Sequence, residues 1–255
     1  MSAFLSLDDI SVRFGGLKAV DRFSMEVQEG SIHALIGPNG AGKSTVFNCI
    51  SRFCTPSEGG IHFDGRDLLS LPAHRVVSSG IGRTFQNLEL LKRMTVLENV
   101  LIGQTAHVPR YVSFGPGAKR KRTEAQAVRE AEAVLEETNL LPYRDTLAGE
   151  LDFGHQKLLD LARALAGKPR LLLLDEPAAG LRNREISFVD ELLVKLAHSR
   201  RLTIILVEHV MPLVMSIADR ITVLNFGQKI AEGAPAEIRC HPKVIEAYLG
   251  SDAHA

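Results

Sequence analysis

The residues best suited to chemistry form one nine-residue stretch, GPNGAGKST. It matches the pattern G-x-x-x-x-G-K-[ST] and lies between an apolar run, IHALIG, and a helical pattern that starts at Lys43. Glycines let backbone N–H groups wrap around phosphate oxygens, Lys43 brings a mobile charge to the β- and γ-phosphates, and the Ser44 hydroxyl can bind Mg²⁺. The alternative is a Gly-rich turn without a ligand. The candidate phosphate-binding residues are Gly37, Pro38, Asn39, Gly40, Ala41, Gly42, Lys43, Ser44 and Thr45.

A second stretch, LLLLDEP, supplies two carboxylates at the end of an unbroken apolar run. Such a run is typical of a buried parallel strand, and α/β sheets bind ligands at the carboxyl ends of their strands. Beside a phosphate loop, Asp175 would hold Mg²⁺ through water, and Glu176 would orient and polarise a water for in-line attack on the γ-phosphate. The alternative is a strand that ends in two solvated acids.

A third stretch, LDFGHQKLLDLARAL, predicts a turn supplied by Gly154 and then a helix that ends near Gly167 and Pro169. A helix N-terminus beside a glycine is an anion site. Asp152 already places a carboxylate there, and aspartate is also a good N-cap residue. The stretch is therefore either an Asp-capped helix or a phosphate site with one unexpected residue.

Strand and helix patterns alternate around these stretches, which predicts an α/β fold with a mainly parallel sheet. A helix-rich middle, from about 88 to 159, predicts an inserted subdomain; within it we expect helices over 95–102 and 123–138, the second capped by Thr123, and a loop over 107–122. The expected strands outside it are 5–14, 23–27, 31–37, 61–65, 80–86, 171–175 and 203–208, with a helix over 184–198 and a hairpin over 221–233 that turns at 226–228.

The amino-acid composition excludes several classes of protein. The 255 residues are 45% hydrophobic and 24% charged, with 30 basic and 30 acidic side chains. Binders of nucleic acid are usually basic, so we expect no nucleic-acid partner. Three cysteines without a CxxC pair fit a reducing compartment. We expect no secretory signal and no membrane span, because the most apolar region, 202–226, is interrupted by charged residues and a proline.

Taken together, the three stretches resemble the ATP-binding subunit of ABC transporters, over essentially the whole chain. The resemblance implies that Phe14, in VRFGG, stacks on adenine, although a core phenylalanine is the alternative. It implies that Gln86, in RTFQN, senses Mg²⁺ and the transmembrane partner. His209, in VEHV, matches the switch histidine at the γ-phosphate, against the alternative of a structural histidine. AAGL, residues 178–181, matches the loop that crosses to a second subunit.

The resemblance also implies a fold, ligands and partners. The expected fold is that of a P-loop NTPase, with a RecA-like parallel sheet core, an N-terminal antiparallel β subdomain and an inserted α-helical subdomain. Residues 1–88 and 160–255 would form the ATP-binding core, and 89–159 the helical subdomain. ATP and Mg²⁺ are the implied ligands, with Ser44, Gln86 and Asp175 around the metal. Lys43, Gln86, Glu176 and His209 would be catalytic.

The implied partners are transmembrane permease subunits and a second ABC ATPase, in a heterodimer or a homodimer, with a substrate-binding protein acting indirectly. The chain would lie at the cytoplasmic face of the inner membrane. GIGRTFQNLELLKRMTVLENVLIG, DEPAAGL and APAEIRCHPKVIEAYLG are similar to the ATPases of branched-chain amino-acid importers. Urea or short-amide importers are the alternative. A non-transport ABC ATPase and a weakly hydrolysing regulatory subunit are further alternatives.

Two residues depart from the pattern. The family's signature is LSGGQ, and its serine donates a hydrogen bond to the γ-phosphate of the partner's ATP; here the five residues are Leu151, Asp152, Phe153, Gly154 and His155. An ionised Asp152 only accepts hydrogen bonds. Arg182 stands where the subfamily usually has Asn or Asp. We therefore expect one competent ATP site in a dimer, and one weakened by Asp152. The basic run Lys119–Arg122 is expected to be a solvated loop, with anionic lipid or nucleic acid as alternative contacts.

Overall fold

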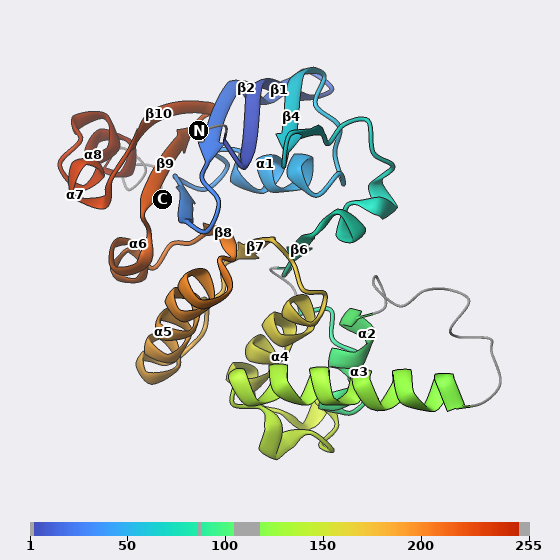
Figure 1. The fold of residues 1–255 in the computed structure, drawn as a ribbon. Helices are drawn as coiled ribbons and strands as arrows, with labels where there is room; N and C mark the ends of the chain where they lie inside the picture. The colour runs from blue at the N-terminus through green and yellow to red at the C-terminus, as the bar shows by residue number, and fades with distance from the viewer. Residues whose placement is uncertain (1–2, 86–87, 105–117, 250–255) are drawn as a thin grey trace.

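Two sheets form the frame of the computed structural model, which describes residues 3–85, 88–104 and 118–249 (Figure 1). The larger sheet has the order β10-β9-β3-β8-β7-β6, and all its neighbours are parallel except the β9–β10 hairpin. Its strands are β3 (Ile32–Ile36), β6 (Ile81–Arg83), β7 (Leu171–Asp175), β8 (Thr203–Val207), β9 (Arg220–Asn225) and β10 (Gln228–Gly233).

The smaller sheet is antiparallel and has the order β2-β1-β4-β5. Its strands are β1 (Leu5–Phe14), β2 (Leu17–Val27), β4 (Glu58–Phe63) and β5 (Arg66–Asp67). The α/β prediction, with a mainly parallel sheet and an N-terminal antiparallel β part, is confirmed. The helices are α1 (Lys43–Ile50), α2 (Val96–Gly103), α3 (Ala118–Glu137), α4 (Phe153–Ala166), α5 (Asn183–Arg200), α6 (Met211–Ile217), α7 (Pro235–Arg239) and α8 (Pro242–Leu249).

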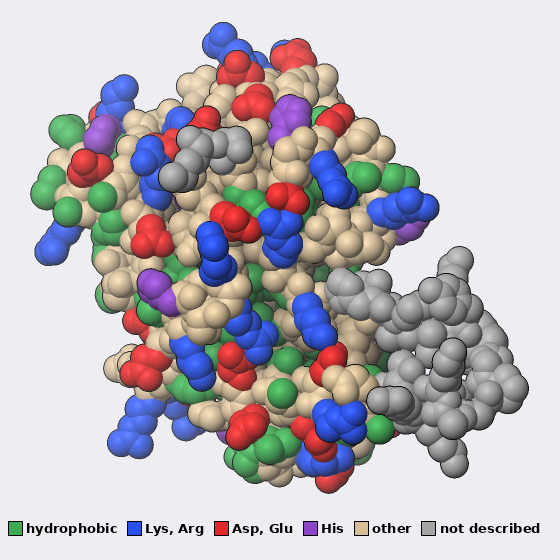
Figure 2. Space-filling view, in the orientation of Figure 1, with side chains coloured by type: hydrophobic (Ala, Val, Ile, Leu, Met, Phe, Trp, Pro, Cys, Tyr) green, Lys and Arg blue, Asp and Glu red, His purple; other side chains and the backbone are tan. Residues whose placement is uncertain are grey.

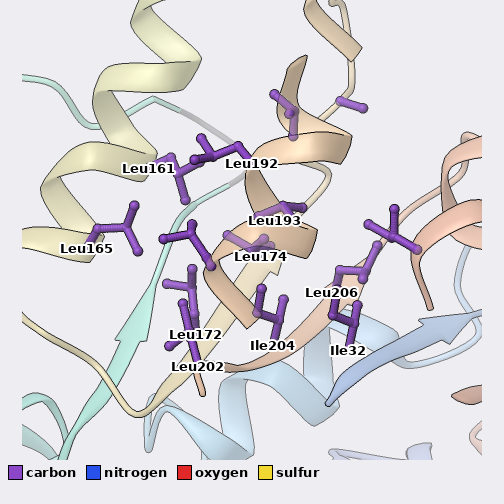
Figure 3. Packing of buried hydrophobic residues seen from close by; sticks show 14 of the residues in the cluster. Ile32, Leu161, Leu165, Leu172, Leu174, Leu192, Leu193, Leu202, Ile204 and Leu206 are labelled. Carbon is purple, nitrogen blue, oxygen red and sulfur yellow. The ribbon is translucent and has the colours of Figure 1, made fainter. Parts of the chain in front are cut away.

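The central strands bury both faces, which explains their unbroken apolar runs. In β7, Leu172 and Leu174 join the core under α4 and α5, as Figure 3 shows. Leu171 and Leu173 point to the other side, where α1 and the small sheet close a second core. Because successive side chains of a strand alternate between faces, one apolar run serves both cores. The carboxyl ends of these strands are thereby fixed in position, and they carry the candidate site.

The helical part of the chain packs on the first of these cores. Thr95 begins α2 with a capping box, since its side chain accepts a hydrogen bond from Glu98 N and the Glu98 side chain accepts one from Thr95 N. The predicted start of the next helix at Thr123 is wrong, because α3 already begins at Ala118. Alanine, lysine and arginine are strong helix formers, so the run AKRKR extends the helix backward. The basic run Lys119–Arg122 therefore lies on a helix and not in a loop.

The boundaries between core and helical subdomain stay a prediction. The helix α4 runs across the expected boundary at 159/160, and its buried residues join the same apolar cluster as β7 and β8. Basic and acidic side chains are interspersed on the face shown in Figure 2. Among the described residues, no helix is both long and apolar enough to span a membrane.

The double-sided packing of β7 gives a stability prediction. Leu172→Ala removes a fully buried side chain, and we expect the free energy of unfolding to fall by about 2–5 kcal/mol through lost transfer energy and a cavity. Val77→Ala, at a half-exposed position, is the matched control, with an expected change within about 0.5 kcal/mol. Urea unfolding of both variants measures this. Equal effects would contradict the assignment of Leu172 to the core.

Candidate nucleotide-binding site

The phosphate loop joins β3 to α1, as its sequence predicts. Gly37, Gly40 and Gly42 all have a positive φ, which side chains with a Cβ rarely adopt. A Cβ on Gly37 would also collide with the carbonyl oxygen of Leu224 in β9. Glycine is therefore required at Gly37 twice over, for its backbone angle and for the close approach of the neighbouring strand.

Lys43 folds back into its own loop. Its Nζ donates to the carbonyl oxygens of Gly37, at 2.7 Å, and Pro38, at 2.9 Å. Burial lowers the pKa of Lys43, while the charges of Glu176 and Asp175 act in the opposite direction. The ammonium group is thus partly desolvated and bonded only to neutral carbonyls. Phosphate oxygens would be stronger acceptors for it, because hydrogen bonds between charged partners are shorter and stronger.

Glu176 stands at the end of β7 in a left-handed conformation, with φ 51°. Its N–H donates to Val207 O at 2.9 Å, and its carbonyl accepts from Lys157 Nζ at 2.9 Å. A non-glycine residue keeps such an angle only where its surroundings over-determine it. The Glu176 carboxylate lies 3.1 Å from His209 Nε2. The two residues expected at the γ-phosphate therefore face each other.

Asp175, the neighbour of Glu176, is buried and lies 3.4 Å from the guanidinium of Arg83. Burial raises the pKa of Asp175, while Arg83 lowers it. Arg83 also donates to Asn48 Oδ1, at 2.8 Å, and to Ser51 Oγ, at 2.6 Å, both on α1 or its C-cap. One cation thus ties the helix of the phosphate loop to the carboxylate end of β7. Three aromatic rings surround it at 5.1–5.8 Å, those of Phe47, Phe53 and Phe85.

Glu208, just before His209, is a buried carboxylate at 1% exposure. It accepts from the N–H of Ala178 at 2.7 Å, of His209 at 2.8 Å and of Val210 at 3.0 Å. Hydrogen bonds to a charged acceptor are about twice as strong as neutral ones. Glu208 therefore holds the loop after β8 against the loop after Glu176, so the two loops keep a fixed position relative to each other.

These elements surround a cavity of about 460 Å³. Its polar lining includes the phosphate loop from Asn39 to Thr45, Glu176 and His209. Its apolar lining includes Phe14, Leu17 and Phe226. Phe14 is 53% exposed, so the alternative of a core phenylalanine is wrong. The exposed Ser44 also lines the cavity, and Gln86 lies outside the described residues.

The signature stretch does not line this cavity within the part of the chain that the structure describes. Asp152 is the N-cap of α4, and its carboxylate accepts from His155 N and contacts His155 Nδ1, both at 2.8 Å. The backbone hydrogen bond of His155 lowers the pKa of Asp152, and the charge of Arg182 adds to this. The Asp-cap interpretation is confirmed. Asp152 is exposed, so it faces outward from this chain.

The predicted turn at Gly154 is wrong, because Gly154 lies inside the first turn of α4. It is a glycine for another reason: an added Cβ would collide with the carboxylate of Glu185 in α5. Glu185 in turn accepts from Arg182 N at 2.7 Å. A Cβ on Gly180 would lie 2.7 Å from the ring of Phe153. The signature stretch is thus packed tightly on the loop that follows Glu176.

Comparison with known proteins decides the family. A sequence profile described as "ABC transporter" matches residues 20–179. The chain belongs to the ABC transporter family. A second profile, for the branched-chain amino acid ATP-binding cassette transporter, matches residues 228–254.

Several members of the ABC transporter family are similar over nearly their whole length. The chain is 43% identical to the high-affinity branched-chain amino acid transport ATP-binding protein BraF of Pseudomonas aeruginosa, covering 96% of this chain and 97% of that protein. It is 42% identical to the corresponding LivG protein of Escherichia coli, with the same coverage. A solved nucleotide-free ATP-binding cassette from an ABC transporter is 34% identical, with a TM-score of 0.84 over 96% of this chain and 98% of that chain.

Four residues of this ABC ATPase escaped sequence reasoning: Arg83, Lys157, Glu208 and Phe226. Arg83 lies within the motif RTFQN and Glu208 within VEHV, but the sequence does not show which residues they contact. Phe226 had a weak signal of its own, because a large apolar residue is unusual in a tight hairpin turn. The partner of Lys157, a backbone carbonyl, leaves no trace in sequence.

The buried carboxylate of Glu208 gives a second prediction. Glu208→Ala leaves three backbone N–H groups without their acceptor. We expect the free energy of unfolding to fall by at least about 1–3 kcal/mol, the cost of a buried donor left unpaired. Glu237→Ala is the control, since Glu237 accepts one exposed N–H, that of Ala234, and should matter much less. Chemical denaturation compares the two, and equal losses would contradict this role of Glu208.

Proposed function

We propose that this chain is the ATP-hydrolysing subunit of an importer for branched-chain amino acids. The observation that carries the proposal is the single cavity in which the phosphate loop meets the Glu176–His209 pair, at 3.1 Å. Such a pair beside a phosphate cradle suits in-line attack of water on a γ-phosphate. The 42–43% identity to BraF and LivG, with nearly complete coverage, supports the choice of cargo.

In the proposed reaction the chain's own residues bind the phosphates and orient and polarise the attacking water. Lys43 exchanges its bonds to the Gly37 and Pro38 carbonyls for phosphate oxygens. The Glu176 carboxylate accepts a hydrogen bond from the attacking water and aligns it. His209, beside Glu176, donates toward the γ-phosphate. Because Glu176 is fixed at its backbone, its carboxylate keeps its direction while the nucleotide changes.

The donor set fits a divalent cation. Ser44 and Asp175 offer the hydroxyl and carboxylate oxygens that Mg²⁺ prefers, and Gln86 is the third proposed ligand. Asp175 is a buried carboxylate whose pKa is raised by burial, so a nearby cation would stabilise its ionised form. When bound, Mg²⁺ would act as a Lewis acid that offsets the charge developing on the phosphates during transfer.

The proposed assembly is a head-to-tail dimer docked on transmembrane permease subunits at the cytoplasmic face of the inner membrane. Its support within this chain is the separation of the signature stretch from the chain's own cavity. The N-terminus of α4, with the exposed Asp152, is then the part of this chain that would face the partner subunit's nucleotide. A second ABC ATPase with an intact signature would then complete the site around Lys43. A substrate-binding protein would deliver the amino acid to the permeases.

In such a dimer the two ATP sites differ. The signature serine of the family donates to the partner's γ-phosphate, whereas Asp152 carries a lowered pKa and stays ionised at neutral pH. Its negative charge meets a negative phosphate. We therefore infer that the ATP held by Lys43 turns over, while the ATP facing Asp152 turns over slowly.

The first test replaces the proposed general base. In the assembled transporter, Glu176→Gln in this chain should lower ATP turnover by about 10²–10⁴-fold, the usual contribution of a positioned acid or base. Nucleotide binding should persist, because the phosphate loop is unchanged. Steady-state phosphate release and equilibrium ATP binding are the measurements. Near-wild-type turnover would refute the assignment of the competent site to this chain.

The second test concerns the weakened site. In the Glu176→Gln background, the remaining turnover belongs to the partner's ATP, and Asp152→Ser should raise it about tenfold or more by restoring a hydrogen bond to a charged group. Asp152→Ala is the matched control, since it removes the charge without adding a donor, and assembly should stay intact. A silent Asp152→Ser would show that Asp152 serves only as a helix cap.

A further inference from the structure

The hairpin turn between β9 and β10 exposes a large apolar side chain. Phe226 is 86% exposed, more than any other large hydrophobic residue that the structure describes. Most residues of β9 are buried, whereas the turn residue Phe226 is exposed, so its side chain is not part of the core. A side chain of this kind that contributes nothing to the core suggests a binding role.

The backbone at Phe226 is strained as well. Its φ is 45°, and Gly227 follows at 77°, so both central residues of the turn have positive φ. Turns of this kind favour Asn-Gly, Asp-Gly or Gly-Gly, and a bulky residue at positive φ is a genuine outlier. The chain therefore has an aromatic ring at a position where its own folding favours asparagine.

Three hydrogen bonds hold this turn against the phosphate loop and the small sheet. Gly227 N donates to the carbonyl oxygen of Ala41, and Gly227 O accepts from Asp21 N, both at 2.9 Å. Gln228 Nε2 donates to the Asp21 carboxylate at 3.0 Å. The backbone position of Phe226 is thus set relative to the phosphate loop.

Phe226 lines the same cavity as Phe14 and Leu17, together with the phosphate loop. Phe14 and Leu17 pair across β1 and β2, and both are exposed. Three exposed apolar side chains from two hairpins thus line one cavity with a loop built for phosphates. A ligand that suits this lining has a flat apolar ring and a polyphosphate.

We propose that Phe226 forms a second wall of the subsite for the purine base of the nucleotide. Phe14 covers the base from β1, and Phe226 contacts it from the β9–β10 turn. This inference rests on the proposed function, because it names a residue that binds the base of the same ATP. The strain at Phe226 is then explained, since the ring is held ready for a ligand and not for the fold.

Equilibrium binding of ATP and of inorganic tripolyphosphate to the full chain separates the base from the phosphates. Phe226→Ala should weaken ATP binding about tenfold, within the range found for loss of one base–aromatic stack, and leave tripolyphosphate binding unchanged. Phe226→Tyr, which keeps the ring, should bind ATP as the wild type does. Val77→Ala, distant in sequence and half-exposed, is the neutral control.

Phe226→Asn makes the test independent of folding. Asn-Gly suits a turn with two positive φ angles, so the unfolding midpoint should stay equal or rise while ATP binding falls about tenfold. If Phe226→Ala and Phe226→Asn both leave the affinity for ATP unchanged, the proposal is wrong. It is also wrong if these variants weaken only the assembly with a partner and bind ATP as the wild type does. Failure of the wild-type chain to bind both ATP and tripolyphosphate would instead refute the proposed function.

Discussion

The conformation of Glu176 is the constraint on which the site depends. A left-handed φ at a glutamate is unfavourable by itself, and it persists because three elements bond to the same peptide units. The strand β8 accepts its N–H, the helix α4 donates to its carbonyl through Lys157, and Ala179 N closes a turn on that carbonyl at 3.2 Å. The backbone position from which the carboxylate extends is therefore set by several segments at this edge of the sheet.

Lys157 links the backbone of Glu176 to the signature stretch, because Lys157 lies in α4, the helix that begins within that stretch. The helix α4 carries Asp152 at its N-terminus and Lys157 one turn later, and the Lys157 ammonium also lies 5.8 Å from the ring centre of Phe153. Burial lowers the pKa of Lys157, while the charges of nearby carboxylates, Glu208 first among them, raise it. A shift of α4 at its outward-facing end would strain the bond to the Glu176 carbonyl. In the proposed assembly, the end of α4 that carries Asp152 would thus be tied to Glu176, the proposed general base.

The sequence predicts the features that depend on local residue patterns. It does not predict the contacts between segments that are distant in the chain. The phosphate loop, the strand before Asp175 and the cap at Asp152 follow from spacing and residue type, and the structure has each of them in place. Gly154 was misassigned because it lies in the first turn of α4, close to the Glu185 side chain 31 positions away in a different helix. The Thr123 start failed because charge suggested a loop where helix propensity prevailed. The bonds of Arg83 and Glu208 join segments that only the fold brings together.

The two departures from the family pattern act on one another. Asp152 and Arg182 are separated by 29 intervening residues, yet the charge of Arg182 contributes to the lowered pKa of Asp152, after the larger effect of His155. Both sit on segments that pack through Gly154 against Glu185 and through Phe153 against Gly180. The positive charge of Arg182 thus offsets part of the negative electrostatic potential around the exposed Asp152 carboxylate. It does not restore the missing hydroxyl donor, because a compensating charge keeps Asp152 ionised and an ionised carboxylate only accepts hydrogen bonds. In the proposed dimer, Arg182 would therefore moderate the repulsion between Asp152 and the partner's phosphate, while that site would still lack its hydroxyl donor.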